Sequence, residues 1–285
     1  MKNDIPKRFH AIKGTPATAG VACSGRQSMK TSMRARQNRD WTPDDMSGDI
    51  TAWYKADSLS GSDGDSIGSW SDSSANSNTV AQLTSARQPT LQIDELNGYP
   101  VLRFDGTNDI LSDGDISDLD VGTGDIWIAA VFKSTDDSGV QFMFEKGTTS
   151  FGLMTSAAGV LQARLGGTTN IPLQNSGNWS RTGFVLVTAS RVSSTCTGFV
   201  NGSAMDTTST TNTGSISNSD VLDIGATAVG GNPLTGDIAE ILVGGATLTL
   251  KRRTKLEGYL AHKYGLEGNL PSDHTYKSFA PGRFN

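Results

Sequence analysis

The sequence is poor in cysteine and histidine, and this scarcity excludes several kinds of site. The two cysteines among its 285 residues, Cys23 and Cys196, lie far apart, and neither belongs to a Cys-x-x-Cys motif. This spacing indicates two free thiols rather than a zinc site or a redox-active pair. The three histidines, His10, His262 and His274, all lie outside the central part of the chain. Their positions argue against a serine or cysteine hydrolase, which needs a histidine base beside its nucleophile.

Long hydrophobic runs are also missing. No apolar segment approaches the roughly 20 residues that a transmembrane helix requires. Residues 1–20 lack the continuous apolar core of a signal peptide. We therefore expect a protein that has no membrane partner and is not exported by the general secretory route. The phosphate-binding motifs Gly-x-x-x-x-Gly-Lys and Gly-x-Gly-x-x-Gly after a strand are absent as well, which argues against nucleotide-dependent chemistry.

Small and polar residues are abundant instead. Hydrophobic residues make up 35% of the chain, which holds 33 glycines, and serine, threonine and asparagine crowd the segments between the apolar stretches. This balance is typical of many short strands joined by tight turns. The length allows one large β-domain with extensions.

Positive charge is concentrated at the N-terminus. Residues 1–40 hold nine lysines and arginines against Asp4 and Asp40, so they carry about +7, whereas the whole chain carries −5. The remaining residues therefore carry about −12. A basic arm on an acidic body suggests that the arm binds another negatively charged surface. The alternative is a solubilising disordered tail. Protein is favoured over nucleic acid as the partner, because the arm lacks interleaved aromatic residues.

Hydrophobic alternation and turn motifs predict strands from residue 50 onward. Residues 50–56 form the first predicted strand, and the Asn-Gly pairs at 97–98 and 201–202 predict hairpin turns. The uninterrupted apolar run at residues 126–132 predicts a strand that is covered on both faces. Residues 221–224 and 238–243 supply the last two predicted strands.

The faces of two further strands can be predicted from single residues. Val140, Phe142 and Phe144 alternate along the chain, so we expect them to share one buried face. Residues 184–189 predict a second sandwich strand with a buried face, because Phe184, Leu186 and Thr188 alternate with Val185, Val187 and Ala189. The one predicted helix spans residues 250–264, with Thr249 as its N-cap and Gly265 as its C-cap.

Seven short segments occur in an order that resembles a known superfamily. They are AWYKAD (52–57), WSD (70–72) followed by Asn76 and Asn78, QPT (88–90), NGYPVLRFDG (97–106), NG (201–202), GDIAEI (236–241) and EGYLAHKYGL (257–266). Together they resemble the concanavalin-A-like/laminin-G superfamily, in the form common in bacteriophage structural proteins and bacterial adhesins. The resemblance spans residues 50–266. The chain departs from the family pattern at Lys251 and Arg252, where acidic residues are usual.

The resemblance implies an all-β fold in which two curved antiparallel sheets form a jelly-roll β-sandwich. We expect one short C-terminal helix and an extended N-terminal arm. The predicted boundaries are residues 1–45 for the arm, 46–268 for the lectin-like sandwich and 269–285 for a C-terminal tail.

Glycosidases also occur on this sandwich fold, and they need two carboxylates that face one cleft. Asp237 and Glu240 are three residues apart on a predicted strand, so they are expected to point to opposite faces. The motif Glu-x-Asp-x-x-Glu of sandwich endoglucanases is absent. We therefore expect no enzymatic activity and assign no catalytic residue.

Acidic and aromatic residues bear on metal and sugar binding. The loops contain several aspartates, namely Asp63, Asp65, Asp105, Asp109, Asp113 and Asp115. Their spacing does not fit an EF-hand, and turn formation is the simpler account. We expect no cofactor and no metal ligand, with a calcium ion at the sheet rim as the alternative. Four tryptophans, Trp53, Trp70, Trp127 and Trp179, lie in or beside strand patterns and are expected in the core rather than on a sugar-stacking surface.

The basic arm and the resemblance together predict a virion structural protein. We expect a capsid decoration, or cement, protein on the capsid surface of the virion, present in multiple symmetric copies. Its arm would bind the major capsid protein or another virion protein through Lys7, Arg8, Lys13, Arg26, Lys30, Arg34, Arg36 and Arg39. One alternative is a phage tail-fibre or receptor-binding protein that binds a host surface glycan. A glycoside hydrolase on the same fold is the other.

Overall fold

The computed structural model describes residues 40–135, 139–147, 150–166, 171–172, 183–205, 214–227 and 230–282. The chain divides into two units, Met1–Arg39 and Asp40–Asn285, and the described residues all belong to the second unit. The eight basic residues assigned to the arm therefore lie outside the described residues. Those assignments stay predictions.

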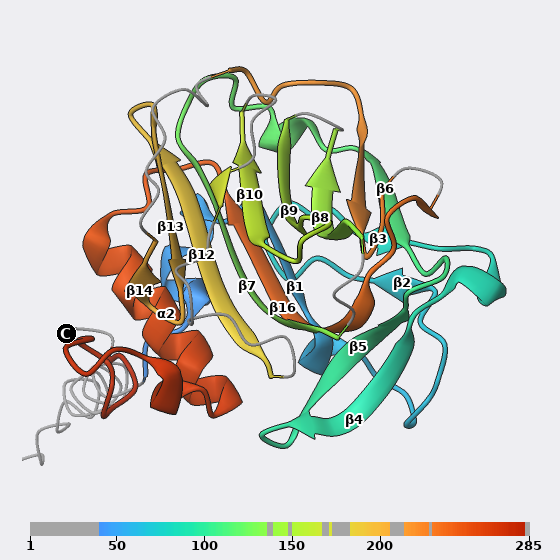
Figure 1. Ribbon diagram of the computed structural model, residues 1–285, viewed down its shortest axis with the longest axis horizontal. Helices are drawn as coiled ribbons and strands as arrows, with labels where there is room; N and C mark the ends of the chain where they lie inside the picture. Colours follow the sequence, from blue (N-terminus) through green and yellow to red (C-terminus); the bar gives the residue numbers. More distant parts are fainter. Residues whose placement is uncertain are drawn as a thin grey trace, which may run out of the picture. The chain divides into compact units, whose positions relative to one another are not determined.

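Two antiparallel sheets form the second unit (Figure 1). The first sheet has the spatial order β14 (Ser203–Ala204), β13 (Thr195–Val200), β12 (Val185–Val192), β7 (Ile126–Ser134), β16 (Thr235–Gly244), β5 (Tyr99–Asp105) and β4 (Thr90–Leu96), and β1 (Ala52–Lys55) pairs with β16. The second sheet has the order β11 (Ile171–Pro172), β10 (Leu161–Leu165), β9 (Phe151–Thr155), β8 (Gln141–Lys146), β15 (Val221–Ile224), β6 (Leu111–Asp115), β3 (Val80–Ala81) and β2 (Ser69–Trp70). The predicted all-β sandwich is confirmed.

One hydrophobic core fills the space between the sheets, and a second lies on the outer face of the first sheet. Strand β7 contributes to both. Ile128 and Phe132 lie in the inner core, whereas Trp127 and Val131 lie in the outer one. The prediction that residues 126–132 are covered on both faces is therefore confirmed. Apolar side chains at every position of β7 are stable because each face meets another apolar layer.

Helix α2 (Leu250–Tyr264) covers part of the outer face of the first sheet (Figure 1). Its N-cap is Thr249, whose side-chain oxygen accepts a hydrogen bond from the Arg252 amide. Its C-cap is Gly265 in the left-handed conformation, with φ of 67°. Both caps are as predicted. The basic first turn has partners, since Arg252 lies 2.7 Å from Asp49 and Arg253 lies 2.7 Å from Glu257.

Short 3₁₀ turns connect the strands and extend the helix. They are η1 (Pro43–Asp49), η2 (Ala56–Ser58), η3 (Ser85–Arg87), η4 (Ser117–Leu119) and η6 (Glu267–Asn269).

Both predicted hairpin turns are present. Asn97 and Gly98 join β4 to β5 with positive φ values of 52° and 78°, and Asn201 and Gly202 join β13 to β14 in the same way. Two consecutive positive φ values are the signature of the turn that fits a twisted hairpin.

The predicted alternation of Val140, Phe142 and Phe144 is wrong. The register of β8 against β9 shifts between Phe142 and Phe144, which marks a β-bulge. Met143 and Phe144 both lie in the core between the sheets. Phe142 therefore points to the opposite, outer face. A bulge inserts one residue into a strand and reverses the face of every residue beyond it.

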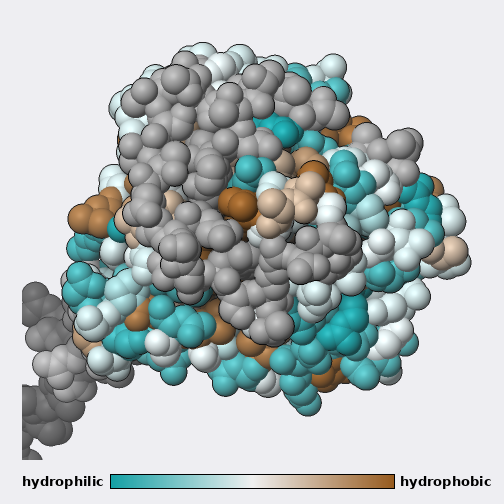
Figure 2. Space-filling view, viewed as in Figure 1, coloured by the Kyte–Doolittle hydropathy of each residue, from teal (hydrophilic) through white to brown (hydrophobic). Residues whose placement is uncertain are grey.

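The surface drawn in Figure 2 is mostly hydrophilic where it is coloured, with scattered hydrophobic residues. Among the described residues, the large hydrophobic side chains with high exposure come from separate elements, such as Leu83 in the loop before η3 and Leu250 at the start of α2. Single exposed apolar residues of this kind are normal on a protein surface. In the described part of the chain, no helix is long and apolar enough to cross a membrane.

Candidate functional site

The outer face of the second sheet carries polar side chains in register across neighbouring strands. Ser112 of β6 pairs with Asp223 of β15, and Asp223 pairs with Glu145 of β8. Gly152 of β9 pairs with Glu145 on one side and with Arg164 of β10 on the other. We call Ser112, Asp223, Glu145 and Arg164 the second-sheet row. Directly paired residues lie about 5 Å apart at their β-carbons, so these side chains are close neighbours.

The members of the second-sheet row bind one another. The Ser112 hydroxyl donates a hydrogen bond of 2.5 Å to Asp223. The Arg164 guanidinium lies 3.6 Å from the Glu145 carboxylate, and Gly152 between them has no side chain that would separate the two. The row thus combines two carboxyl groups with a hydroxyl and a guanidinium.

Burial changes the proton affinity of this row. Loss of water raises the pKa of Glu145 from 4.5 to about 7; Arg164 opposes the shift and Asp223 adds to it. Burial also raises the pKa of Asp223. The hydrogen bond from Ser112 acts in the opposite direction and lowers the pKa of Asp223, but its effect is smaller than that of burial. The Glu145 carboxyl can therefore donate or accept a proton near neutral pH, a property that functional sites often use.

A cavity of about 410 Å³ adjoins Glu145 and Arg164. Phe142 and Met154 supply apolar surface to its wall, and Gln162 and Asn232 supply amides. The Arg164 guanidinium stands over the Phe142 ring, 6.0 Å from its centroid. A cavity of this size with both apolar and hydrogen-bonding groups can hold a small polar ligand.

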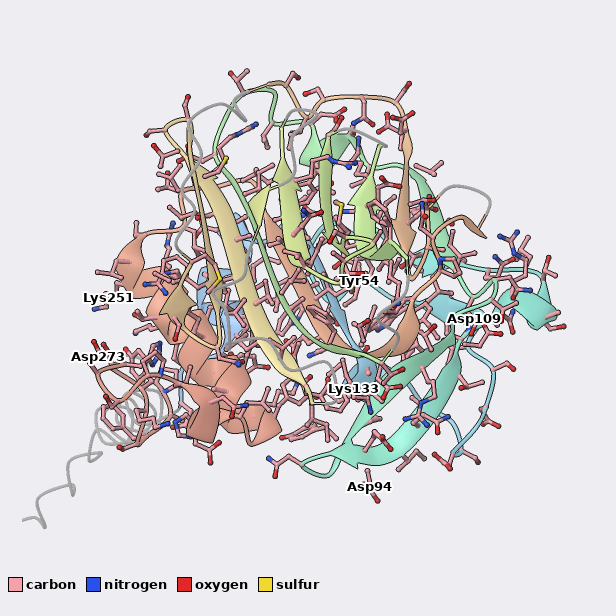
Figure 3. All side chains as sticks on the ribbon, viewed as in Figure 1. Tyr54, Asp94, Asp109, Lys133, Lys251 and Asp273 are labelled. Atoms are coloured by element: carbon pink, nitrogen blue, oxygen red, sulfur yellow. The ribbon has the colours of Figure 1, made fainter. Side chains whose placement is uncertain are left out.

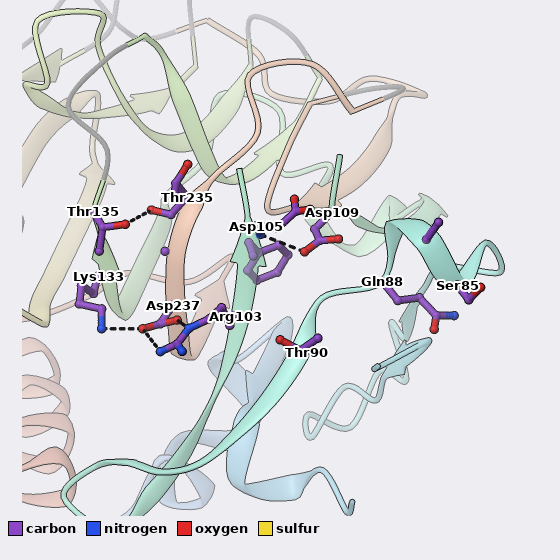
Figure 4. A pocket seen from close by; sticks show the side chains of 13 residues that line it. Ser85, Gln88, Thr90, Arg103, Asp105, Asp109, Lys133, Thr135, Thr235 and Asp237 are labelled. Carbon is purple, nitrogen blue, oxygen red and sulfur yellow. Dashed lines mark hydrogen bonds and ion pairs between the residues drawn. The ribbon is translucent and has the colours of Figure 1, made fainter. Parts of the chain in front are cut away.

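A second hollow, of about 550 Å³, lies on the first sheet (Figure 4). Its wall contains another set of residues in register. Lys133 of β7 pairs with Asp237 of β16, which pairs with Arg103 of β5, which pairs with Thr90 of β4. We call these four residues the first-sheet row, and we call the hollow the groove.

Salt bridges hold the first-sheet row in place. Asp237 is almost completely buried, with 1% of its side chain exposed, and lies 2.7 Å from both Arg103 and Lys133. Glu95 also binds Arg103, at 2.9 Å. Figure 4 shows Lys133, Asp237 and Arg103 together on one side of the groove, with Asp109, Gln88 and Ser85 toward the other. Burial raises the pKa of Asp109.

The predicted orientation of Asp237 and Glu240 is wrong. The register of β16 against β7 shifts between Ile238 and Glu240. Because of this bulge, both carboxylates lie on the outer face of the first sheet. They still do not form a pair. Glu240 is engaged by Trp53 at 2.6 Å and by Lys263 at 2.8 Å, separately from the partners of Asp237.

The loop aspartates act mainly in turns. Asp65 accepts a hydrogen bond from the Ser62 amide, and Asp105 accepts one from the Thr107 amide. Asp63 instead binds a distant strand, by accepting a hydrogen bond from the Ile93 amide of β4. Asp115 instead forms a salt bridge of 3.1 Å with Lys146. Within the described ranges, no group of three or more histidine, cysteine, aspartate or glutamate side chains is arranged to hold a metal ion. The expectation of no cofactor stays a prediction.

The tryptophans lie where the sequence predicted, as far as they are described. Trp53, Trp70 and Trp127 are buried, and Trp179 lies outside the described residues. The thiol of Cys196 is buried, and burial raises its pKa to about 11. Cys23 lies outside the described residues as well.

Sequence reasoning missed both rows. Glu145 and Asp223 are far apart in the chain, and the bulge in β8 reversed the expected face of the residues around Glu145. Charged residues inside otherwise apolar strands were the available signal. They mark positions that face away from the core, but they do not reveal which strands are neighbours.

Comparison with known proteins identifies a superfamily. The family model of the concanavalin A-like lectin/glucanases superfamily matches residues 105–251. A search of curated protein sequences returned no significant match.

Several solved structures resemble this chain at low sequence identity. The binding domain of Paraclostridial Mosquitocidal Protein 1 has a TM-score of 0.58 and 13% identity, over 75% of this chain and 52% of that chain. A Trypanosoma rangeli sialidase has a TM-score of 0.49 and 11% identity, over 84% of this chain and 38% of that chain. The CBM40 of a Ruminococcus gnavus IT-sialidase, bound to alpha2,3 sialyllactose, has a TM-score of 0.41 and 16% identity, over 52% of this chain and 91% of that chain. The chain spans about two fifths of the length of the sialidase chains that it matches.

Proposed function

The chain belongs to the concanavalin A-like lectin/glucanases superfamily, and from this membership we propose that it is a glycan-binding protein without enzymatic activity. Its binding site is the outer face of the second sheet. The observation that carries this proposal is the second-sheet row, whose Glu145 carboxyl and Arg164 guanidinium line a cavity of about 410 Å³.

The chemistry of this face suits a sugar. Sugar hydroxyls both donate and accept hydrogen bonds, and the face offers acceptors at Glu145 and donors at Arg164 and Gln162. The C–H surface of a sugar ring needs apolar contact, which Phe142 and Met154 supply. Ligand pockets commonly combine a few placed polar groups with such apolar surface.

The contacts within the row favour binding over hydrolysis. A glycosidase uses one carboxyl as acid and the other as base or nucleophile on the substrate. Here Glu145 lies against Arg164, and Asp223 accepts a hydrogen bond from Ser112. Both carboxyl groups thus already have partners in the sheet. A glycoside hydrolase is nevertheless the alternative that the raised pKa of Glu145 favours, because a general acid needs such a pKa.

A glycan array probed with the full-length chain tests the proposal. We expect retention on a defined set of glycans, and a loss of about tenfold or more in affinity for Arg164→Met, which removes a charged hydrogen-bond donor. Asp94→Asn is the control, because Asp94 projects from the β4–β5 hairpin, far from the second sheet (Figure 3). Equal binding by Arg164→Met and Asp94→Asn would show that this face is not the site.

The same glycans decide between binding and hydrolysis. We expect no reducing sugar to be released when the wild-type chain is incubated with any glycan that it binds. Release that is lost in Glu145→Gln and kept in Asp94→Asn would establish a glycosidase and reject the non-enzymatic role.

A second candidate function is attachment to a virion as a capsid decoration protein. The charge distribution favours it, since residues 1–40 carry about +7 and the remainder about −12. In this proposal the basic arm anchors the chain to a capsid protein, in multiple symmetric copies, while the sandwich projects outward. The two candidates are compatible, because the arm and the sheet face are separate parts of the chain. Salt-sensitive attachment through the arm is the property that distinguishes a decoration protein from a free lectin.

A further inference from the structure

We propose that the groove on the first sheet is a second glycan-binding site and that it takes a neutral oligosaccharide. The inference rests on the proposed function and extends it to a separate surface. The groove belongs to strands β4, β5, β7 and β16 and to the loops that flank them, whereas the second-sheet row belongs to the opposite sheet.

The donors of the groove are fixed before any ligand arrives. Arg103 binds Asp237 through two nitrogens, at 2.7 and 3.1 Å, and also binds Gln92 and Glu95. Lys133 lies 2.7 Å from the same carboxylate and 4.8 Å from the centroid of the Phe184 ring. Side chains held in this way lose little further freedom when a ligand binds, which improves affinity.

A second set of polar residues lies one step along the same strands. Thr135, Thr235 and Asp105 each lie two residues from a member of the first-sheet row, so they share its face. All three line the groove. The Thr135 amide donates to the Thr235 carbonyl at 2.8 Å, which keeps the two strand ends together. Hydroxyl groups and a carboxylate thereby face the same hollow as Arg103 and Lys133.

The charges of the groove argue for a neutral ligand. The two cations, Arg103 and Lys133, are balanced by Asp237 and Glu95. Asp105 and Asp109 then leave an excess of negative charge, which disfavours a carboxylate, sulfate or phosphate group. A neutral sugar has hydroxyl groups that accept from the cations and donate to the carboxylates, so it satisfies both sides of the groove.

The groove also has suitable dimensions and some apolar surface. A volume of about 550 Å³ lies within the usual range for small-ligand sites. Ala86 contributes carbon surface to the lining. With one site on each sheet, a single chain could hold two segments of one polysaccharide, and linked binding of this kind raises the overall affinity.

Native gel electrophoresis of the full-length chain through gels containing soluble starch, galactomannan or alginate tests the inference. Starch and galactomannan are neutral probes, and alginate is the anionic one. Each gel is run at low and at high salt, because the basic arm adds charge-dependent retention. The groove variants are Lys133→Met and Asp105→Asn, which remove a donor and an acceptor in separate chains. Lys251→Met is the matched control, because Lys251 lies on α2, away from the groove (Figure 3).

We expect at least one neutral gel to retard the wild-type chain at both salt concentrations. Each groove variant should raise the dissociation constant about tenfold, while Lys251→Met leaves it unchanged. Unchanged retention of both groove variants, together with a loss in Arg164→Met, would overturn this inference and leave the proposed function standing. If alginate retards the wild-type chain at high salt and Lys133→Met abolishes this retardation, the groove binds an anionic sugar, and the proposal of a neutral ligand is wrong. Free migration of the wild-type chain in every gel would count against the proposed function and this inference alike.

Discussion

At the scale of single residues, Glu145 couples folding to pH. Its carboxyl has a pKa near 4.5 when exposed and about 7 in the fold, because burial disfavours the charged form. Between pH 4.5 and pH 7, Glu145 therefore binds a proton more fully in the folded chain than in the unfolded chain. Folding stability contributed by this group is therefore complete below pH 4.5 and is lost as pH rises through 7.

We predict that Glu145→Gln makes stability less dependent on pH. The wild-type chain should lose up to about 3 kcal/mol from this group between pH 4.5 and 7, and the glutamine variant should not, because it cannot ionise. Urea unfolding at several pH values between 4 and 8 measures the difference. Asp94→Asn, at an exposed hairpin position, serves as the control. If the unfolding free energy of Glu145→Gln depends on pH in the same way as that of the wild-type chain, the pKa of Glu145 is not the cause of the pH dependence.

At the scale of elements, one buried carboxylate connects three segments. Glu257 on α2 accepts a hydrogen bond from Thr188 of β12 at 2.7 Å and pairs with Arg253 on its own helix. His274 in the C-terminal segment lies 3.2 Å from the same carboxylate. The side chain of Glu257 is fully buried, so these partners replace the hydrogen bonds that water would otherwise supply. The contact fixes both the helix and the segment that follows it to the first sheet.

We predict that Glu257→Ala destabilises the fold by about 3–5 kcal/mol, because Arg253 and the Thr188 hydroxyl lose a buried partner. Urea unfolding monitored by tryptophan fluorescence measures the loss. Asp273→Ala is the matched control, since Asp273 is exposed beside the same segment (Figure 3). A similar, small effect of both substitutions would show that the buried contact contributes little.

Two bulges decide which side chains share the outer faces of the two sheets. The bulge in β8 places Phe142 and Glu145 together on the outer face of the second sheet. The bulge in β16 places Glu240 on the same face as Asp237. Strict alternation along the sequence predicted the opposite in both strands. A β-bulge leaves little trace in the hydrophobic pattern, because it is defined by the pairing with a neighbouring strand.

At the scale of the whole molecule, the contrast in charge between arm and body makes a prediction about assembly. We predict that the full-length chain co-sediments with undecorated bacteriophage capsids at low salt and dissociates at high salt. A chain that lacks residues 1–39 should not bind. Truncation after Arg39 keeps Trp41, which is buried and packs edge-on against Tyr259 at 6.3 Å. Equal binding of both chains would reject the arm as the anchor.

The sequence by itself determined the fold class, both Asn-Gly turns and the bounds and caps of helix α2. It could do so because hydrophobic period, turn chemistry and capping depend on residues that are close in the chain. It also predicted that residues 126–132 are buried on both faces.

Only the tertiary structure decided where the candidate sites lie. Ser112, Glu145, Arg164 and Asp223 come from four strands, and they meet because of sheet order and register. The first-sheet row is assembled from four strands in the same way. Pairing between distant strands depends on the closure of long loops and on the packing of the whole sandwich, which no local pattern encodes.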